Sequence, residues 1–140
     1  MRYLALMATM LLGCGPSEPL RVEVHSAQAW AHRADLDERA RAVSAAAAGW
    51  WGASLSDLDG WTLAVTDPPL EAPDAGGLTM FGRARIEVST AFGPCVEAAP
   101  IPHEIGHAVL FVTTGDPDSH HLDSRWRFVR PAGAAFCGGQ

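Results

Sequence analysis

Residues 100–113, PIPHEIGHAVLFVT, constrain the fold of this chain more than any other segment. Pro102 suits a first helical turn, because the fixed φ of proline matches a helix and the amide proton that it lacks is not needed there. The apolar residues of the segment recur at helical spacing and form one stripe: Ile101, Ile105, Ala108 and Val112. The segment therefore predicts a helix that ends near Thr113 and packs by this stripe.

Two histidines and a glutamate stand on this predicted helix. His103 and His107 are four residues apart, so both imidazoles project from one face, close enough to share one tetrahedral metal ion. Glu104 lies beside them and can accept the proton of a water molecule whose pKa a metal ion lowers toward about 7. The pattern His-Glu-x-x-His thus combines two metal ligands with a general base. Zinc is the expected metal, although other divalent ions also accept imidazole ligands.

A third ligand has to come from further along the chain. Glu104 is the last glutamate in the sequence, so the remaining candidates are aspartates and histidines. The predicted helix ends about 10 Å past His107, and six or seven further residues cover that distance after a Gly-Asp-Pro turn. Histidine is the preferred nitrogen ligand, and two adjacent histidines leave the choice open. The candidates are Asp116, Asp118, His120, His121 and Asp123.

The N-terminal residues indicate export. Arg2 precedes an apolar run over residues 3–12 that is too short to span a bilayer and is typical of a signal peptide. The run ends in Leu-Leu-Gly followed by Cys14, which resembles the lipobox of bacterial lipoproteins, where the cysteine is acylated and becomes the new N-terminus. An ordinary signal peptide or a buried N-terminal segment is the alternative.

The lipoprotein resemblance implies a division of the chain and a location. It implies a signal peptide over residues 1–13, a lipidated cysteine and tether over residues 14–20, and a folded domain over residues 21–140. Gly15, rather than aspartate, follows the cysteine, which implies the outer membrane of the cell envelope. The lipid on Cys14 would be the contact with the membrane.

If Cys14 carries lipid, Cys95 and Cys137 remain in an oxidising compartment, where two leftover cysteines most often pair. A disulfide between them would stabilise the fold by roughly 4 kcal/mol in the chain-entropy model. Free thiols or thiolate metal ligands are the alternatives.

Composition excludes other classes of protein. The net charge is −6 and every basic residue is an arginine, scattered along the chain, so no clustered positive face exists for nucleic acid. Five Trp and five Phe in 140 residues are enough for a core, which argues against disorder. The length suits one modest domain.

The remaining patterns predict an α+β fold. Residues 26–48 follow helical spacing and predict a packing helix. Alternation of apolar and polar residues predicts strands over residues 61–66 and 83–90, with a loop over residues 70–77 between them. One face of the second strand should face water. Three tryptophans at the ends of these elements could line a cleft, although core positions are favoured: Trp50, Trp51 and Trp61.

Over residues 78–123 the chain resembles the zincin metallopeptidases. The resemblance implies a small zincin-like domain in which a packing helix and a short sheet accompany the His-Glu-x-x-His helix. His103 and His107 would then bind zinc and Glu104 would polarise water. Residues 83–90 would be the edge strand that binds an extended peptide by strand addition.

The subtype of zincin depends on the third ligand. Metzincins place Gly and His three and six residues after the second motif histidine, where this chain has Leu110 and Thr113. Gluzincins use a downstream Glu, which is absent. The run Gly-Asp-x-Asp-x-x-His resembles small bacterial zincins and favours His121 over His120 as the third ligand. Asp118 or Asp123 would then orient an imidazole.

The sequence therefore predicts a membrane-tethered zinc metalloendopeptidase that acts on peptides or proteins and binds no nucleic acid. Many zincins stabilise the oxyanion with a Tyr, but Tyr3 lies in the leader, which leaves the metal, the unused histidine, Arg125 or Arg127. The first alternative is a non-catalytic envelope lipoprotein that retains the metal site. The second is a zinc-carrying or metal-sensing protein whose site is closed by a fourth protein ligand.

Overall fold

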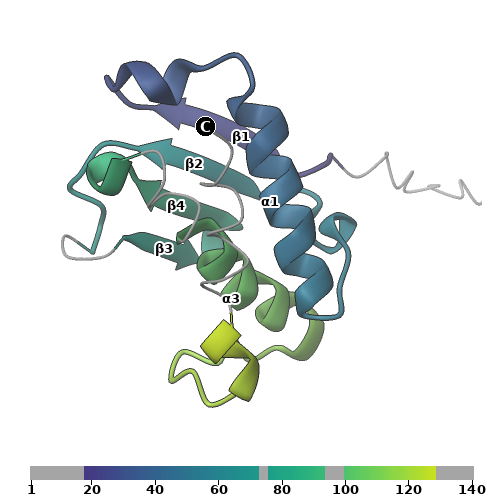
Figure 1. Ribbon diagram of the computed structural model, residues 1–140. Coiled ribbons are helices and arrows are strands. Elements are labelled where there is room, and N and C mark those ends of the chain that lie inside the picture. The colour runs from purple at the N-terminus through teal and green to yellow at the C-terminus, as the bar shows by residue number, and fades with distance from the viewer. Residues whose placement is uncertain (1–17, 73–75, 94–99, 129–140) are drawn as a thin grey trace, which may run out of the picture.

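The computed structural model describes residues 18–72, 76–93 and 100–128 (Figure 1). Within these ranges the chain forms a four-stranded sheet and two α-helices, a mixed α/β architecture consistent with the predicted α+β class. The strands are β1 (Arg21–His25), β2 (Thr62–Thr66), β3 (Gly77–Met80) and β4 (Arg85–Ser89), and the helices are α1 (Leu36–Trp50) and α3 (Pro100–Thr114). Short 3-10 turns cover Ala29–His32, Leu55–Leu58, Phe81–Arg83, Thr90–Phe92 and Ser124–Phe128.

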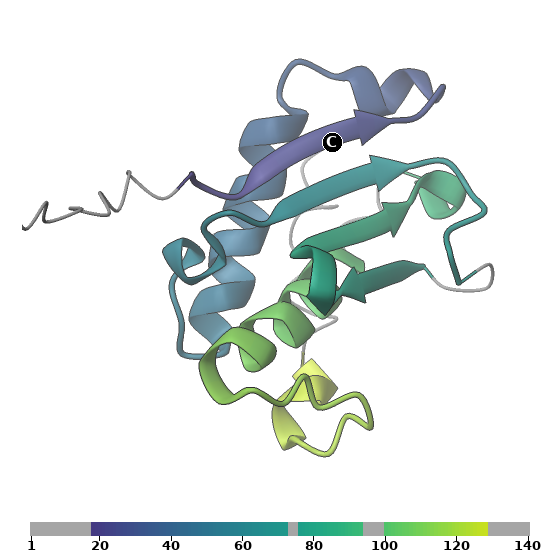
Figure 2. The same ribbon diagram turned by 180° about the vertical axis from the view of Figure 1, so that it is seen from behind.

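The sheet has the strand order β1-β2-β4-β3. Strands β1, β2 and β4 run parallel, whereas β3 is an edge strand antiparallel to β4. Both helices cover the same face, as the view from behind shows with the sheet in front of them (Figure 2). The fold therefore has two layers, and α3 lies under β3 and β4.

The core lies between the sheet and the helices. Successive side chains of a strand point to opposite faces, so alternate residues of β2 and β4 enter the core, and each of these is at most 1% exposed: Leu63, Val65, Ile86 and Val88. They pack with Ile105 and Val109 of α3. The buried face of α1 consists mainly of alanines, and their small size lets the two helices approach closely.

Charged side chains lie on the other face of the sheet. Arg85 of β4 donates hydrogen bonds to Glu87 on its own strand, at 3.0 Å, and to Glu23 of β1, at 3.1 Å. The hydrocarbon parts of such side chains can cover a small residue beneath them, and Ala64 of β2 is fully buried. The prediction that residues 83–90 form a strand with one face toward water is thus confirmed in β4.

Asp67 ties together the ends of three strands. Its carboxylate accepts hydrogen bonds from the hydroxyl of Ser26 at 2.6 Å, the amide of Ala27 at 2.7 Å and the hydroxyl of Thr90. These groups follow β1 and β4, and Asp67 itself follows β2. The hydrogen bonds, first that from Ser26 and then that from Thr90, hold the pKa of Asp67 below its ordinary value of 3.8.

Two predictions about local structure are wrong. The helix expected over residues 26–48 begins only at Leu36. Ser26 and Ala27 donate to the Asp67 carboxylate, Ala29–His32 form a 3-10 turn, and Arg33 after it is extended. The edge strand expected at residues 83–90 is an interior strand, paired with β2 on one side and β3 on the other. β3, which was not predicted, forms the edge.

The remaining expectations have mixed outcomes. The strand expected over residues 61–66 is confirmed as β2, and the motif helix as α3. Trp51 and Trp61 are core residues, whereas Trp50 is 46% exposed. Leu20, expected at the end of the tether, is fully buried. The leader, Cys14 and the predicted disulfide between Cys95 and Cys137 lie outside the described residues. No helix in the described part of the chain combines the length and the apolar composition that crossing a bilayer requires.

We expect Gly106→Ala to destabilise the protein by about 1–3 kcal/mol, because a methyl group there has no room. A Cβ at Gly106 would lie 2.6 Å from Nε1 of Trp51 and 2.9 Å from Cη2 of Trp126. The matched control is Gly49→Ala near the end of α1, where a Cβ meets nothing within 4 Å. It should stabilise by up to about 1 kcal/mol, since alanine is the better helix former. Urea unfolding measures both, and equal effects would contradict the packing described.

Asp67→Asn should lower the midpoint of urea unfolding at about pH 7, and the difference from the parent should be smaller at acidic pH. The folded state holds the pKa of Asp67 below its ordinary value, so the stability that the carboxylate contributes is present above that value. This contribution is lost as the pH falls through the lower, folded-state pKa. The gap between parent and variant should therefore narrow as the pH falls below the ordinary pKa of 3.8 and through the lower, folded-state pKa. Asp37→Asn, which removes an exposed ion pair with Arg41, is the control and should change little. A gap that is constant with pH would contradict this role for Asp67.

Candidate metal centre

Helix α3 holds the two motif histidines on its least buried side. Each residue from 101 to 110 except His103 is buried, because the sheet covers one side of the helix and α1 packs against it as well. His103 is half-buried and His107 is 9% exposed. The imidazoles lie one helical turn apart, as the spacing predicted.

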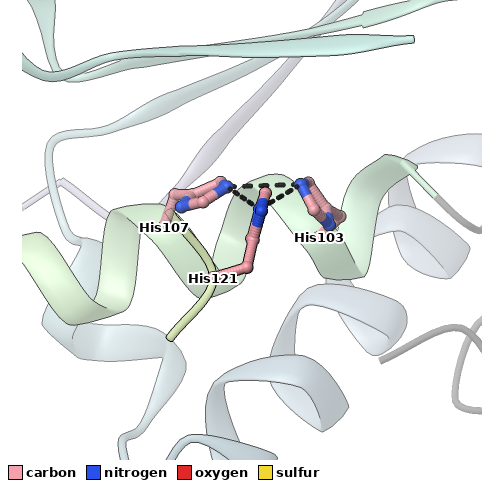
Figure 3. A group of neighbouring side chains, drawn as sticks. All are labelled: His103, His107 and His121. Carbon is pink, nitrogen blue, oxygen red and sulfur yellow. Dashed lines mark hydrogen bonds between the residues drawn. The ribbon is translucent and has the colours of Figure 1, made fainter. Parts of the chain in front are cut away.

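The chain then turns back over the helix. α3 ends at Thr114, and Gly115 follows with a φ of +79°, a left-handed conformation that glycine adopts without strain. The Asp118 carboxylate accepts hydrogen bonds from the amides of Leu122, at 2.9 Å, and Asp123, at 2.8 Å. The carbonyl of Asp118 accepts from the amide of His121 at 2.9 Å. The loop carries His121 back to the motif histidines (Figure 3).

Three imidazole nitrogens converge on one point. The Nε2 atoms of His103 and His107 are 3.2 Å apart, those of His103 and His121 are 3.2 Å apart, and those of His107 and His121 are 3.1 Å apart. Tetrahedral zinc with bonds of about 2.0–2.1 Å places its nitrogen ligands about 3.3 Å from one another. The spacing therefore fits three ligands of a single small cation.

The hydrogen bond at the far side of His107 fixes its tautomer. Nδ1 of His107 lies 2.7 Å from the carbonyl oxygen of Pro117. A carbonyl oxygen only accepts, so Nδ1 must carry the proton and neutral His107 presents an unprotonated Nε2 to the cluster. Burial, the largest cause, lowers the pKa of His107 and so favours this neutral form. His107 thus has the protonation state that a metal ligand requires.

Glu104 lies on the sheet side of the cluster. Its Oε2 accepts a hydrogen bond of 2.7 Å from Oγ1 of Thr79 in β3. Burial raises the pKa of Glu104 above its ordinary value, and the Thr79 hydrogen bond opposes that shift. A Cβ at Gly77 would lie 2.6 Å from Cγ of Glu104, so the strand approaches the carboxylate as closely as glycine permits.

A pocket opens beside this carboxylate. Its empty volume is about 430 Å³, part of it continuous with solvent. It is lined by Gly77, Leu78, Thr79, Phe81, Glu104, His107 and Ser119. A ligand in the pocket would touch the edge strand, the glutamate and one motif histidine together.

The structure decides between the adjacent histidines by position. His121 joins the cluster, whereas His120 is exposed and belongs to no metal-ligand group among the described residues. A direct hydrogen bond from an imidazole to Asp118 or Asp123, as expected, is not found among the described residues. Asp118 binds backbone amides, and Asp123 pairs with Arg125 at 2.6 Å.

Two residues at the site escaped sequence reasoning. Thr79 was missed because β3 was not predicted. Trp126 lies next to all three imidazoles, with ring centroids 4.4–5.0 Å apart. The available signal for Trp126 was its position in the sequence, five residues after His121. Arg125, a candidate for the oxyanion, instead donates to the carbonyl of Trp51 and lies 4.6 Å over its ring.

Comparison with known proteins adds no assignment, because no family model, no curated protein and no solved structure matches the chain.

The geometry predicts that His121→Ala loses metal and that His120→Ala keeps it. Only His121 places an Nε2 atom within 3.2 Å of both motif histidines. Elemental analysis of the full-length protein after zinc loading and dialysis should give one ion per chain for the parent and His120→Ala. Zinc retained by His121→Ala and lost by His120→Ala would contradict the observed loop.

Proposed function

We propose that this protein is a zinc-dependent peptidase whose metal is held by His103, His107 and His121. The observation that carries the proposal is the convergence of three Nε2 atoms at 3.1–3.2 Å beside a buried carboxylate. The arrangement of a motif helix under a sheet, with an antiparallel edge strand, supports the zincin-like fold that the sequence resemblance implies.

The metal ligands and the residues around them have separate roles in the proposed reaction. A zinc ion bound to the three histidines would act as a Lewis acid toward a carbonyl and lower the pKa of water. Pro117 keeps His107 in the tautomer that presents a lone pair. Thr79 holds one carboxylate oxygen of Glu104, and burial raises the pKa of that carboxyl, which favours proton acceptance closer to neutral pH. Glu104 is thus the general base.

The substrate that fits this site is an extended peptide. β3 is the edge strand next to the pocket, and within the described sheet no strand pairs with its outer side. A peptide can therefore pair there, in place of the interior strand first expected in that role. Leu78 and Phe81 give the pocket an apolar wall. A peptide on β3 would bring a carbonyl group to the side of the cluster where Glu104 lies.

The site favours an open centre over a closed one. Among the described residues, only three side chains form the metal-ligand group, and no fourth His, Cys, Asp or Glu joins them. Catalysis needs an exchangeable fourth position, whereas a storage or sensing site fills it with protein. This observation favours the peptidase over the metal carrier.

A non-catalytic metal-binding lipoprotein is the second candidate. Arg125, one residue expected to stabilise an oxyanion, is held by Asp123 and Trp51. The metal, His120 and Arg127 remain for that role among the groups first considered. The lipid on Cys14 and the cell-envelope location belong to both candidates.

Glu104→Gln tests the assigned base. We expect hydrolysis of a mixed peptide library by the zinc-loaded, full-length protein to fall by roughly 10²–10⁴-fold, because the amide cannot accept the proton. Zinc content should be unchanged, since Glu104 does not belong to the three-histidine ligand group. Glu71→Gln, which changes an exposed ion pair with Arg83, is the matched control and should leave the rate unchanged.

Chelation completes this test. Removing zinc should abolish hydrolysis, and restoring it should recover the rate. A parent protein that binds zinc yet cleaves nothing would favour the second candidate. Cleavage by Glu104→Gln at the parent rate would exclude Glu104 as the base.

A further inference from the structure

Trp126 packs against the whole histidine cluster. Its ring centroid lies 5.0 Å from that of His103, 4.4 Å from His107 and 4.7 Å from His121. The three imidazole centroids are themselves 4.8–5.0 Å apart. The four rings therefore occupy the corners of a nearly regular tetrahedron, and the indole closes one side of the cluster.

Helical geometry identifies which side this is. At about 100° per residue, Glu104 and Gly106 lie on opposite flanks of the His103–His107 pair. Trp126 is on the Gly106 flank, where a Cβ would lie 2.9 Å from its Cη2 atom. The pocket that Glu104 lines contains no atom of Trp126. The indole thus covers the cluster on the side away from the base.

One carboxylate holds both the indole and the ligand loop. Nε1 of Trp126 donates a hydrogen bond of 2.7 Å to Oδ2 of Asp118, the oxygen that also accepts from the amide of Asp123. The other oxygen accepts from Leu122, the residue after His121. Removing either partner would therefore loosen the other.

The loop needs such a hold because its backbone is strained. Asp118 and His121 have φ values of +49° and +54°, left-handed conformations that residues other than glycine adopt at a cost. Such conformations persist only when surrounding contacts over-determine them. The hydrogen bonds to the Asp118 carboxylate are these contacts.

We propose that Asp118 and Trp126 are positioning residues of the metal centre: together they hold His121 toward the motif histidines and block the flank opposite Glu104. The inference rests on the proposed metal centre and extends it. The cluster would then offer its exchangeable position on the Glu104 side, and a bound ion would be four-coordinate.

The test is a titration of full-length, metal-free protein with Zn²⁺ and Co²⁺, comparing the parent with Asp118→Asn and Trp126→Phe. Both variants should bind zinc about 10–100-fold more weakly than the parent, because losing a contact that supports a metal ligand typically lowers metal affinity by this factor. The double variant should lose little more than the worse single variant, because the two residues share one hydrogen bond. Asp37→Asn and Trp50→Phe, on α1, are the matched controls and should bind like the parent.

Cobalt tests the blocked flank separately. Four-coordinate Co²⁺ absorbs visible light far more strongly than six-coordinate Co²⁺, so the parent should show intense absorption. Trp126→Ala should weaken it as water enters the opened flank. A merely structural tryptophan would lower the yield of folded protein without changing the spectrum per bound ion.

The outcomes separate the two proposals. A parent that binds neither ion defeats the metal centre itself. A parent that binds tightly, with Asp118→Asn and Trp126→Phe matching it in affinity and Trp126→Ala matching its spectrum, overturns the positioning role and leaves the metal centre intact. If Asp118→Asn does not fold by circular dichroism, Trp126→Phe alone decides, because it keeps an aromatic ring and removes the Nε1 donor to Asp118.

Discussion

The burial of α3 is the constraint on which the rest of the site depends. From residue 101 to 110 every residue except His103 is buried, so packing between the sheet and α1 leaves the helix little freedom to rotate or slide. A helix fixed in this way fixes the direction of every side chain on it. The helix therefore sets the directions of the two motif imidazoles and the neighbouring carboxylate, and the loop adds one further imidazole and the Pro117 carbonyl that holds His107.

Desolvation has opposite effects on the two titratable groups that α3 buries. It raises the pKa of Glu104 and lowers the pKa of His107, so both groups are driven toward their neutral forms. A divalent cation bound there would supply positive charge next to these two buried groups.

The sequence predicted the parts of the structure that local pattern determines. The motif helix and the strands β2 and β4 have clear periodicity, and the His-Glu-x-x-His spacing located two of the clustered histidines. The parts that depended on distant contacts were missed. The end of β1 is set by hydrogen bonds to Asp67, about forty residues further along the chain. β3 has only four residues and is stabilised by its pairing with β4. The preference for His121 over His120 came from the resemblance of the ligand loop and not from periodicity, because the turn that Asp118 builds is not encoded in periodicity.

Gly77 gives the edge strand a property that its length does not suggest. Because any Cβ there would collide with Glu104, the first residue of β3 is restricted to glycine for as long as the carboxylate keeps its present position. Strand propensity would favour almost any other residue. Any larger residue at position 77 would displace the Glu104 side chain, so the residue type at this position of the edge strand is coupled to the position of the Glu104 carboxylate. Natural variation at position 77 should therefore track variation at position 104.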